Sequence, residues 1–392
     1  MSRPIRVLEL RSVRGTGGGP EKTILLGAER SDPDRFAVTV CYIRDDRDEV
    51  FGIDRKAGAL PIDYVEVRER HSFDPGVWKQ LRQIIRDKRI DIVHGHEYKT
   101  DLLAWLLARV EPVAPMATAH GWTGHSSRER WVYYPADKKV LSWMPRVVAV
   151  SSDIKNELVR FGANAERITT ILNGIDHRRF RREPERAPAI RAALGLTPDD
   201  FVIGSVGRAE PQKRFDLLIE AFAQLRTAGR RLRLLIAGDG SLREALAAQV
   251  ARLGLQDAVM LLGHRTDVAD LHHAMDLFVQ SSDYEGTPNA VLEAMALETP
   301  LVATDVGGTA EVARSGQDAV IVAPGSADVL VRAIDGAVVD TNGLRVRAAS
   351  ARRRVETVLS FDARMDALER IYTELFEAQQ QQGRTAAAVA RT

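Results

Sequence analysis

Short apolar runs rich in β-branched residues alternate with longer amphipathic stretches from one end of this 392-residue sequence to the other. This alternation constrains the fold most strongly, because strands that alternate with helical patterns are typical of βαβ units and parallel sheets. The segments predicted to be strands are residues 5–10, 36–43, 90–94, 116–119, 147–150, 201–206, 232–237, 259–262, 277–280, 301–303 and 319–322. We therefore predict an α/β protein built from doubly wound parallel sheets.

The alternation is interrupted between residues 173 and 197, where a turn at Asn173-Gly174 is followed by a basic stretch and two prolines. Clusters of this kind mark loops between folded segments. We place a domain boundary there, with an N-terminal domain over residues 1–174 and a C-terminal domain over residues 175–359. Each side carries enough strands for its own doubly wound sheet, in which ligands bind outside the carboxyl ends of the strands. The functional cleft is therefore expected between the two domains.

The last part of the chain is predicted to hold a helix followed by an unfolded tail. The helical pattern covers about residues 360–377, and we expect this helix to pack back on the N-terminal domain. Residues 378–392 (AQQQQGRTAAAVART) carry too few large apolar side chains to bury a core, so we expect them to be disordered.

The composition excludes several classes of protein. Lys and Arg number 55 against 54 Asp and Glu, a formal net charge of +1, so no global field recruits nucleic acid. The single cysteine, Cys41, excludes an internal disulfide framework and is expected to be a small buried apolar residue. The N-terminal segment is too short and too charged for a signal peptide, and no run reaches the roughly 18 apolar residues of a membrane span. The sequence thus predicts a cytoplasmic protein, and peripheral contact with a membrane surface stays open.

The segment 281–296 (SSDYEGTPNAVLEAMA) carries the most specific chemical pattern. Thr287 is a good N-cap and Pro288 a good first helical residue, so a helix is predicted from there to about residue 297. The backbone N–H groups at its start would form an anion site of the kind that holds phosphate. Glu293 would be the only charged residue in the body of this helix, and a carboxylate there needs donors, such as ribose hydroxyls.

Glu285 and Glu293 form an E-x7-E pair inside the string EGTPNAVLEAMA. In isolation, two such glutamates are more often surface charges. The whole string resembles the signature of the retaining glycosyltransferase family 4, and the resemblance extends from about Val7 to about Phe376. It implies the GT-B fold, two Rossmann-like domains that face a central cleft, with Glu285 near the donor sugar and Glu293 on the ribose. The helix N-terminus would bind the diphosphate at Thr287, Pro288 and Asn289.

Basic residues follow the strand predicted at residues 201–206. Gly207-Arg208 and Gln212-Lys213-Arg214 resemble the diphosphate-binding arginine and lysine of the family. In isolation such a stretch is more often solvated surface, so the interpretation depends on its place after the strand. Cations there would stabilise a departing nucleoside diphosphate. Arg208 and Lys213 are therefore candidates for both donor binding and catalysis.

A second loop of the C-terminal half, residues 263–267 (GHRTD), also follows a predicted strand. The resemblance implies that His264 and Arg265 lie near the nucleobase of the donor. Ordinary turn chemistry explains the same residues equally well.

The glycine loop at residues 17–22 (GGGPEK) follows the first predicted strand and opens a helix, so its backbone can approach phosphates closely. It is not a dinucleotide fingerprint, because Pro20 takes the last position of the G-x-G-x-x-G spacing. A plain flexible loop is the alternative. The loop resembles the GG-x-E element of the family, which implies Gly18 as a contact of the sugar diphosphate.

Three histidines lie at the carboxyl ends of predicted strands of the N-terminal half. A single histidine is more often structural than functional, but His120 matches the histidine that the family places near the donor sugar. His94 and His96 are expected only to line the cleft. They form an H-x-H without a third ligand at suitable local spacing, so no metal site is expected.

Two D-x-D strings, residues 32–34 and 46–48, resemble the way metal-dependent GT-A transferases hold a nucleotide. Both lie in highly charged turns, where chance matches are frequent, so we interpret them as solvated loops.

Residues 128–146 (RERWVYYPADKKVLSWMPR) mix aromatic with basic side chains, including Arg128, Arg130 and Arg146. Such a stretch suits a lipid headgroup surface or a lipid-linked acceptor. We favour a helix that packs its aromatic residues on the first sheet, because Pro135 interrupts a continuous amphipathic face.

The resemblance implies transfer of a hexosyl unit from a nucleoside diphosphate sugar to a hydroxyl acceptor, with retained anomeric configuration. The acceptor would be a sugar or a lipid-linked sugar in bacterial-type polysaccharide or glycolipid assembly. The nucleotide sugar is a co-substrate, and no further cofactor or metal is expected. Two alternatives are a nucleotide-sugar epimerase of similar fold and a non-catalytic sugar-nucleotide binding protein; the E-x7-E string argues against the epimerase.

Overall fold

The computed structural model describes residues 3–15, 17–72, 74–122, 129–226 and 230–389. The chain divides into two compact units. Unit 1 consists of Met1–Ile171 together with Arg364–Thr392, and unit 2 of Leu172–Ala363. The sequence placed this division after residue 174, so the boundary in the structure lies three residues earlier.

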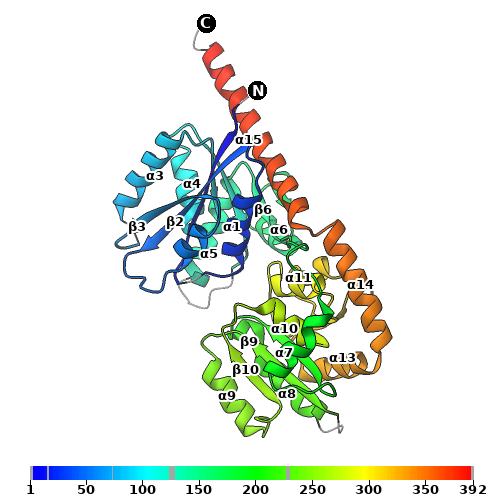
Figure 1. The fold of residues 1–392 in the computed structure, drawn as a ribbon. Coiled ribbons are helices and arrows are strands. Elements are labelled where there is room, and N and C mark those ends of the chain that lie inside the picture. Colours follow the sequence, from blue (N-terminus) through cyan, green and yellow to red (C-terminus); the bar gives the residue numbers. More distant parts are fainter. Residues whose placement is uncertain (1–2, 16, 73, 123–128, 227–229, 390–392) are drawn as a thin grey trace. The chain divides into compact units, whose positions relative to one another are not determined.

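Unit 1 contains a parallel sheet with the strand order β3-β2-β1-β4-β5-β6-β7 among its described residues. Figure 1 shows this sheet with helices around it. The strands are β1 (Ile5–Ser12), β2 (Phe36–Asp45), β3 (Asp63–Glu69), β4 (Ile92–Gly95), β5 (Ala114–Ala119), β6 (Val147–Ala149) and β7 (Ile168–Thr170). The helices are α1 (Gly19–Arg30), α2 (Ile53–Gly58), α3 (Pro75–Lys88), α4 (Tyr98–Leu107), α5 (Tyr134–Trp143), α6 (Ser152–Arg160) and α15 (Phe361–Val389), with a π-helix at Glu129–Tyr133 and a 3-10 turn at Ala165–Arg167. The chain order reverses between β1 and β4, as in a doubly wound sheet.

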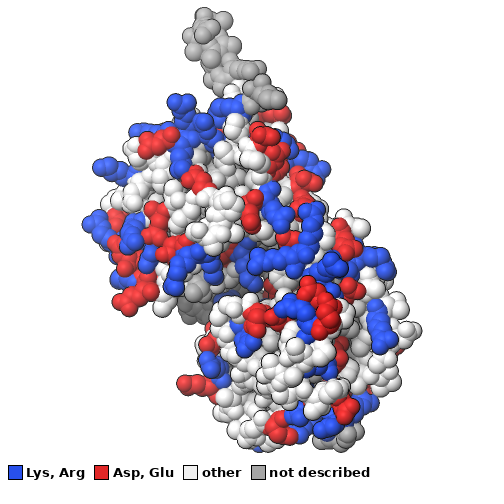
Figure 2. All heavy atoms as spheres, in the orientation of Figure 1, with Lys and Arg blue, Asp and Glu red and all other residues white. Residues whose placement is uncertain are grey.

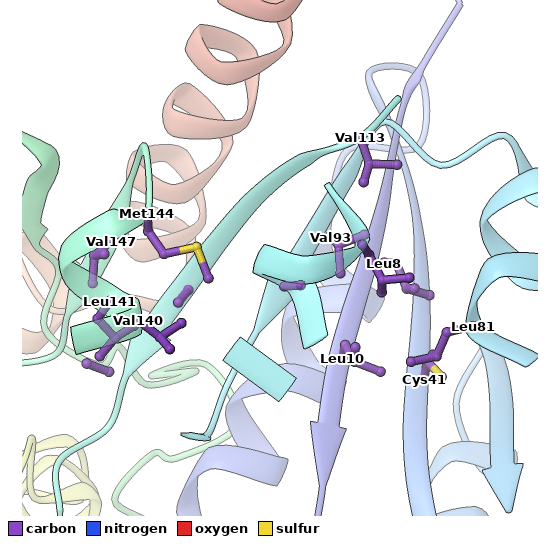
Figure 3. Close-up of a cluster of buried hydrophobic side chains, with 14 of the residues drawn as sticks. Leu8, Leu10, Cys41, Leu81, Val93, Val113, Val140, Leu141, Met144 and Val147 are labelled. Atoms are coloured by element: carbon purple, nitrogen blue, oxygen red, sulfur yellow. The ribbon is translucent and has the colours of Figure 1, made fainter. Parts of the chain in front are cut away.

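Both faces of this sheet are covered, because neighbouring residues of a strand point to opposite faces. On β2, Cys41 and Ile43 join the core beneath α3 to α6, while Val40 and Tyr42 join the core beneath α1 and α2. Figure 3 shows Leu81 of α3 beside Cys41. Cys41 is thus the buried apolar residue that the sequence predicts, and burial raises the pKa of its thiol to about 12.

Unit 2 contains a second parallel sheet, with the order β10-β9-β8-β11-β12-β13 among its described residues. The strands are β8 (Phe201–Val206), β9 (Leu232–Ala237), β10 (Val259–Gly263), β11 (Leu277–Gln280), β12 (Leu301–Thr304) and β13 (Val320–Val322). The helices are α7 (Ala187–Ala193), α8 (Phe215–Arg226), α9 (Arg243–Arg252), α10 (Val268–Ala274), α11 (Asn289–Ala296), α12 (Thr309–Val312), α13 (Ala327–Val339) and α14 (Thr341–Thr357), with 3-10 turns at Pro184–Arg186 and Pro211–Lys213. Its two apolar cores, on opposite faces, again follow the alternation of side chains along the strands.

The predicted fold class of two doubly wound parallel sheets is confirmed. The segments predicted as strands all overlap observed ones, and the sequence missed β3 and β7. Both missed strands lie at the edges of their sheet. β3 (DYVEVRE) carries charged side chains, and β7 (ITT) has only three residues, so neither shows a long apolar run.

The C-terminal helix is longer than the sequence predicts. α15 continues to Val389, although we expected residues 378–392 to be disordered. Residues 378–389 are rich in Ala and Gln, which propagate a helix that is already nucleated. The buried residues Met365, Leu368 and Tyr372 anchor the helix in unit 1, and Gln379 Nε2 donates a 2.9 Å hydrogen bond to the carbonyl of Pro112.

The surface carries both signs of charge. Figure 2 shows basic and acidic side chains interspersed over the visible face, in line with the near-zero net charge. None of the described helices is at once long and apolar enough to cross a membrane.

Candidate active site

The loops that follow β8, β9, β11 and β12 are held together at the carboxyl edge of the sheet in unit 2. Gly307 has a φ of +52°, and a Cβ there would lie 1.8 Å from the carbonyl oxygen of Glu285. Gly238 has a φ of +148°, and its Cβ would lie 1.6 Å from the carbonyl oxygen of Gly207. Only glycine fits either position, because any side chain would collide with the neighbouring backbone. These two glycines let the loops that carry the candidate residues touch.

Glu285 is bound by residues from its own loop and from the loop after β8. Lys213 Nζ lies 2.5 Å from Glu285 Oε1, which also accepts a 2.6 Å hydrogen bond from Ser282 Oγ. The exposed fractions of the two side chains are only 17% for Lys213 and 8% for Glu285. A carboxylate so shielded from water requires a partner, and the ammonium of Lys213 is that partner.

The shape of this loop depends on Gln212. Its Nε2 donates a 2.9 Å hydrogen bond to the carbonyl of Tyr284, next to Glu285. The sequence selected Lys213 and Glu285 separately; it did not predict their contact or the part that Gln212 plays, since these residues are 72 or 73 positions from their partners.

Arg208 lies two residues after β8 and is exposed, as expected for a surface cation at the end of a strand. Its charge affects Tyr284. Burial raises the pKa of the Tyr284 phenol, and the positive charge of Arg208 partly opposes this rise. Arg208 therefore lies within electrostatic range of the loop that carries Glu285.

The helix of the E-x7-E segment, α11, begins at Asn289 with Pro288 as its N-cap. The prediction of Thr287 as the N-cap is wrong by one residue, because Pro288 has an extended ψ of 100°. The backbone N–H of Asn173 donates to Thr287 Oγ1 (3.3 Å), and Asn173 Nδ2 donates to Asn289 Oδ1 (3.1 Å). Both side chains thus hold the turn that opens unit 2.

Glu293 lies on the second turn of α11 and is 7% exposed. Its neighbours Leu292 and Ala294 are buried apolar residues. The sequence predicted such a carboxylate in apolar surroundings, which has to be compensated by hydrogen bonds.

His264 and Arg265 follow β10. His264 is exposed, while Arg265 forms a two-pronged pair with Asp267, at 2.8 Å from Nε and 2.5 Å from Nη2. This pair fixes the turn, so the interpretation of Arg265 as turn chemistry has direct structural support.

The glycine loop of unit 1 leads into α1, whose N-cap is Gly18. Gly18 N donates a 2.5 Å hydrogen bond to Glu21 Oε2, and Arg11 Nε donates another of 2.5 Å to Glu21 Oε1. Arg11 Nη1 continues to the carbonyl of His96 at 2.5 Å. Glu21 and Arg11 together thus link the glycine loop after β1 to the loop after β4. The sequence missed this role, although a Glu at the third position of a helix is a capping signal.

The three histidines lie at the carboxyl ends of β4 and β5 and form one cluster with Glu9 of β1, in which Glu9, His94 and His96 are buried and His120 is half-buried. His96 Nε2 bonds Glu9 Oε2, and His96 Nδ1 lies 3.2 Å from His120 Nε2. Sequence reasoning missed Glu9. The signal was a single charge inside the apolar run of the first strand (VLEL).

Glu9, His94 and His96 also form a group whose potential ligand atoms all lie within 4.8 Å of one another in the described chain. The third group that the H-x-H lacked in sequence is thus supplied by β1, 87 residues before His96. Tyr372 of α15 completes the cluster: its hydroxyl donates to Glu9 Oε1 at 2.5 Å and lies 2.8 Å from His94 Nδ1.

The two D-x-D strings are structural turns. Asp32 Oδ1 accepts a 3.0 Å hydrogen bond from Asp34 N, and Asp48 Oδ2 accepts a 2.6 Å hydrogen bond from Gly15 N. These contacts support their interpretation as loop residues.

The aromatic residues of the stretch 128–146 lie largely outside the core, contrary to the favoured interpretation. Trp131 is 75% exposed and Trp143 is 45% exposed, while Val140 and Leu141 of α5 fill the core in their place. Arg128 and the side chain of Arg130 lie outside the described residues.

Comparisons with known proteins show the family of the chain. The family descriptions Glycosyltransferase Family 4 and Glycosyl transferases group 1 match residues 17–179 and 187–355. EpsD of Bacillus subtilis (strain 168), which is named as a glycosyltransferase, is 30% identical over 296 residues, 71% of this chain and 77% of EpsD. The UDP-Gal:alpha-D-GlcNAc-diphosphoundecaprenol alpha-1,3-galactosyltransferase of Escherichia coli is 25% identical over 309 residues, 75% of this chain and 78% of that protein.

The structural comparison gives the same fold. The crystal structure of Anabaena HepE in complex with UDP-glucose has a TM-score of 0.82 and 21% sequence identity, and the match covers 94% of this chain and 100% of the HepE chain. Two doubly wound sheets match the GT-B fold, and the family matches define a glycosyltransferase. The chain belongs to glycosyltransferase family 4, whose members transfer sugars from nucleotide sugars.

Proposed function

We propose that this glycosyltransferase moves a hexosyl unit from a UDP-hexose to a hydroxyl of a sugar or lipid-linked sugar, with retention of the anomeric configuration. The observation that carries the proposal is the largely shielded Lys213–Glu285 pair at the carboxyl edge of the unit 2 sheet, with Arg208 within electrostatic range of the same loop. UDP-glucose in HepE and UDP-Gal in the name of the Escherichia coli enzyme support the choice of donor. The same name supports a lipid-linked acceptor and a place in polysaccharide or glycolipid assembly.

Charge development in the reaction explains the proposed roles in unit 2. Breaking the anomeric bond builds negative charge on the diphosphate and positive charge on the sugar ring. Arg208, Lys213 and the N-terminus of α11 at Pro288–Asn289 would stabilise the diphosphate by preorganised electrostatics. Glu285 would serve the sugar side, where its carboxylate opposes the developing positive charge.

The other residues take binding roles in this proposal. Glu293 would hold the ribose through charge-assisted hydrogen bonds, and His264 with the turn of Arg265 would lie on the side of the nucleobase. In unit 1, Gly18 would contact the diphosphate and His120 the donor sugar. Residues 175–359 would then form the donor domain and residues 1–174 the acceptor domain.

The transfer would need no divalent metal, because cationic side chains supply the charge that a metal supplies elsewhere. Activity that persists at full rate in EDTA would agree with this. Loss of activity in EDTA that manganese restores would show a metal-dependent reaction instead.

We also propose that unit 1 contacts a membrane surface, where lipid-linked acceptors reside. α4 and α5 pack together and expose apolar side chains beside Arg109 and Lys139. We call the following set the aromatic surface: Tyr98, Leu102, Leu106, Trp131, Val132 and Trp143. Aromatic residues flanked by cations suit the headgroup region of an anionic bilayer.

A thermal-shift panel of UDP-, GDP-, ADP- and dTDP-sugars tests the donor. A ligand at a hundred times its Kd adds about 2.7 kcal/mol to the unfolding free energy, so only the true donor should shift the Tm strongly. Turnover then separates the alternatives. A transferase releases UDP in step with a new glycoside, an epimerase scrambles the sugar without an acceptor, and a binding protein does neither.

A further inference from the structure

We propose that Glu9 and His96 are positioning residues that fix the tautomer of His120, so that His120 offers an unprotonated Nδ1 to a hydroxyl of the donor sugar. This inference rests on the proposed place of His120 beside that sugar. It adds two residues that do not touch the substrate, and it predicts the direction of the hydrogen bond between His120 and the sugar.

The geometry forms a chain of three groups from the ends of neighbouring strands. Glu9 lies on β1, His96 follows β4, and His120 follows β5. β4 lies between β1 and β5 in the sheet, so the middle group can contact both others. His96 Nε2 bonds Glu9 Oε2, and His96 Nδ1 lies 3.2 Å from His120 Nε2.

The carboxylate of Glu9 determines which ring nitrogen of His96 carries the proton. Burial would raise the pKa of Glu9, but the imidazoles of His94 and His96 outweigh burial and hold this pKa well below its usual value. A charged carboxylate only accepts hydrogen bonds, so His96 carries its proton on Nε2. Burial lowers the pKa of His96 to about 4, so the ring is neutral at pH 7 and its Nδ1 must be an acceptor.

Because Nδ1 of His96 is an acceptor, it determines the tautomer of His120. Nε2 of His120 has to donate its proton to His96 Nδ1. Burial, with the charge of Arg11 as the next cause, holds the pKa of His120 well below its usual value, so this ring is also neutral. A neutral imidazole has one N–H, and Nδ1 of His120 is therefore an acceptor. It can accept a hydrogen bond from a sugar hydroxyl, but it cannot donate one.

The same contacts argue against a preformed metal site at Glu9, His94 and His96. His96 Nε2 and Tyr372 OH already donate to the two oxygens of Glu9, and His94 Nε2 lies 2.7 Å from Thr118 Oγ1. Each group therefore has a protein partner of the right polarity, which is the arrangement expected of a hydrogen-bond relay.

Nuclear magnetic resonance of the full-length protein labelled with 15N-histidine tests the tautomers directly at pH 7.5. The relay predicts a scalar coupling across the hydrogen bond between His120 Nε2 and His96 Nδ1, with the proton attached to His120. Resonances are assigned with His96→Gln and His120→Gln. A proton on His120 Nδ1, or on His96 Nδ1, would overturn the proposal.

Kinetics test whether the relay matters for the reaction. Glu9→Gln keeps the shape of the side chain but allows either tautomer of His96, so kcat should fall on the order of tenfold or more. The affinity for UDP should change less than about twofold. Tyr372→Phe is the matched control, because it removes the donor to the other oxygen of Glu9 and leaves the relay intact; its kcat should stay within about threefold of the wild type. Equal losses in both variants would show a merely structural network and overturn the proposal.

Donor analogues test the direction of the bond to the sugar. A fluorine accepts hydrogen bonds but does not donate them, so at the contacted position the wild type should reject deoxyfluoro and deoxy donors alike, by tenfold or more in kcat/KM. His120→Ala should remove this discrimination. If the tautomers are as stated but His120→Ala discriminates like the wild type, the sugar contact of His120 is wrong and the relay alone survives. If His120→Ala removes discrimination but the deoxyfluoro donor is accepted, the acceptor assignment is wrong while the proposed function stands.

Discussion

Lys213 Nζ and Glu285 Oε1 lie 2.5 Å apart, so the ammonium proposed to bind the diphosphate already neutralises the carboxylate proposed to serve the sugar. Both side chains are largely shielded from water, which strengthens their electrostatic interaction. A bound diphosphate would share Lys213 with Glu285, and this sharing links the two proposed roles.

Replacing Glu285 should affect turnover more than binding. Glu285→Gln retains an acceptor for Ser282 Oγ but removes the charge near the reacting sugar, so kcat should fall on the order of a hundredfold. The affinity for UDP should not fall, because Lys213 is then available to the diphosphate. Steady-state kinetics and calorimetric titration with UDP measure the two effects.

Glu293→Gln should show the opposite pattern. Loss of its charge weakens hydrogen bonds to ribose hydroxyls, so UDP binding should weaken by about 1 to 2 kcal/mol. Glu244→Gln, at an exposed position on α9, is the control and should change neither quantity. A fully active Glu285→Gln, or equal loss of UDP affinity in the Glu285 and Glu293 variants, would refute the assigned roles.

Gly307→Ala should disturb the loop of Glu285. The added Cβ would lie 1.8 Å from the carbonyl oxygen of Glu285, so that loop must move, and we expect a loss of about 2 kcal/mol or more in stability together with lower kcat. Gly316→Ala is the matched control, because Gly316 also has a positive φ, +73°, but open space around it. It should cost only about 1 kcal/mol. Urea unfolding measures the loss of unfolding free energy in both variants. Similar losses would mean that the close approach to Glu285 does not matter for stability.

Membrane binding should depend on the aromatic surface. The double change Trp131→Ser and Trp143→Ser removes its two exposed tryptophans, so cosedimentation with anionic vesicles should drop several-fold. Val339→Ser, at a 68% exposed position on α13 in unit 2, should leave vesicle binding unchanged. Binding that is insensitive to the tryptophan changes would place the membrane contact elsewhere or exclude it.

Asp101 of α4 and Asp137 of α5 should make stability depend on pH. Oδ1 of each is buried and has no hydrogen-bond partner among the described residues, which a shared proton between the two carboxyl groups would explain. Burial raises the pKa of Asp101 well above its usual value and that of Asp137 to about 6. The folded state therefore holds protons that the unfolded state releases near pH 3.9, and this stability is lost as the pH rises through 6.

Asp101→Asn isolates that contribution, because its amide donates to Asp137 at every pH. The unfolding free energy of the variant relative to the wild type should rise between pH 5 and pH 8, as urea titrations can measure. Asp153→Asn, an exposed change on α6, should give a constant difference. A constant difference for Asp101→Asn as well would exclude a shared proton.

Local patterns were enough to predict the strands that run through apolar segments and to select candidate residues at strand ends. β8, β9 and β11 have the predicted bounds, because an apolar run flanked by turn residues is a local signal. The E-x7-E string is equally local, so Glu285 and Glu293 could be selected without any knowledge of their surroundings.

The tertiary structure alone decided which of these residues meet. Lys213 and Glu285 are 72 residues apart, Glu9 and His96 are 87 apart, and Glu9 and Tyr372 are 363 apart. These contacts depend on the order of the strands and, for Tyr372, on the path of α15. Neither feature can be recognised from a periodic pattern in the sequence. The sequence by itself therefore determined the sheets and the residue types at their edges, while the pairing of Glu285 with Lys213 and of His120 with His96 arises only where distant segments fold together.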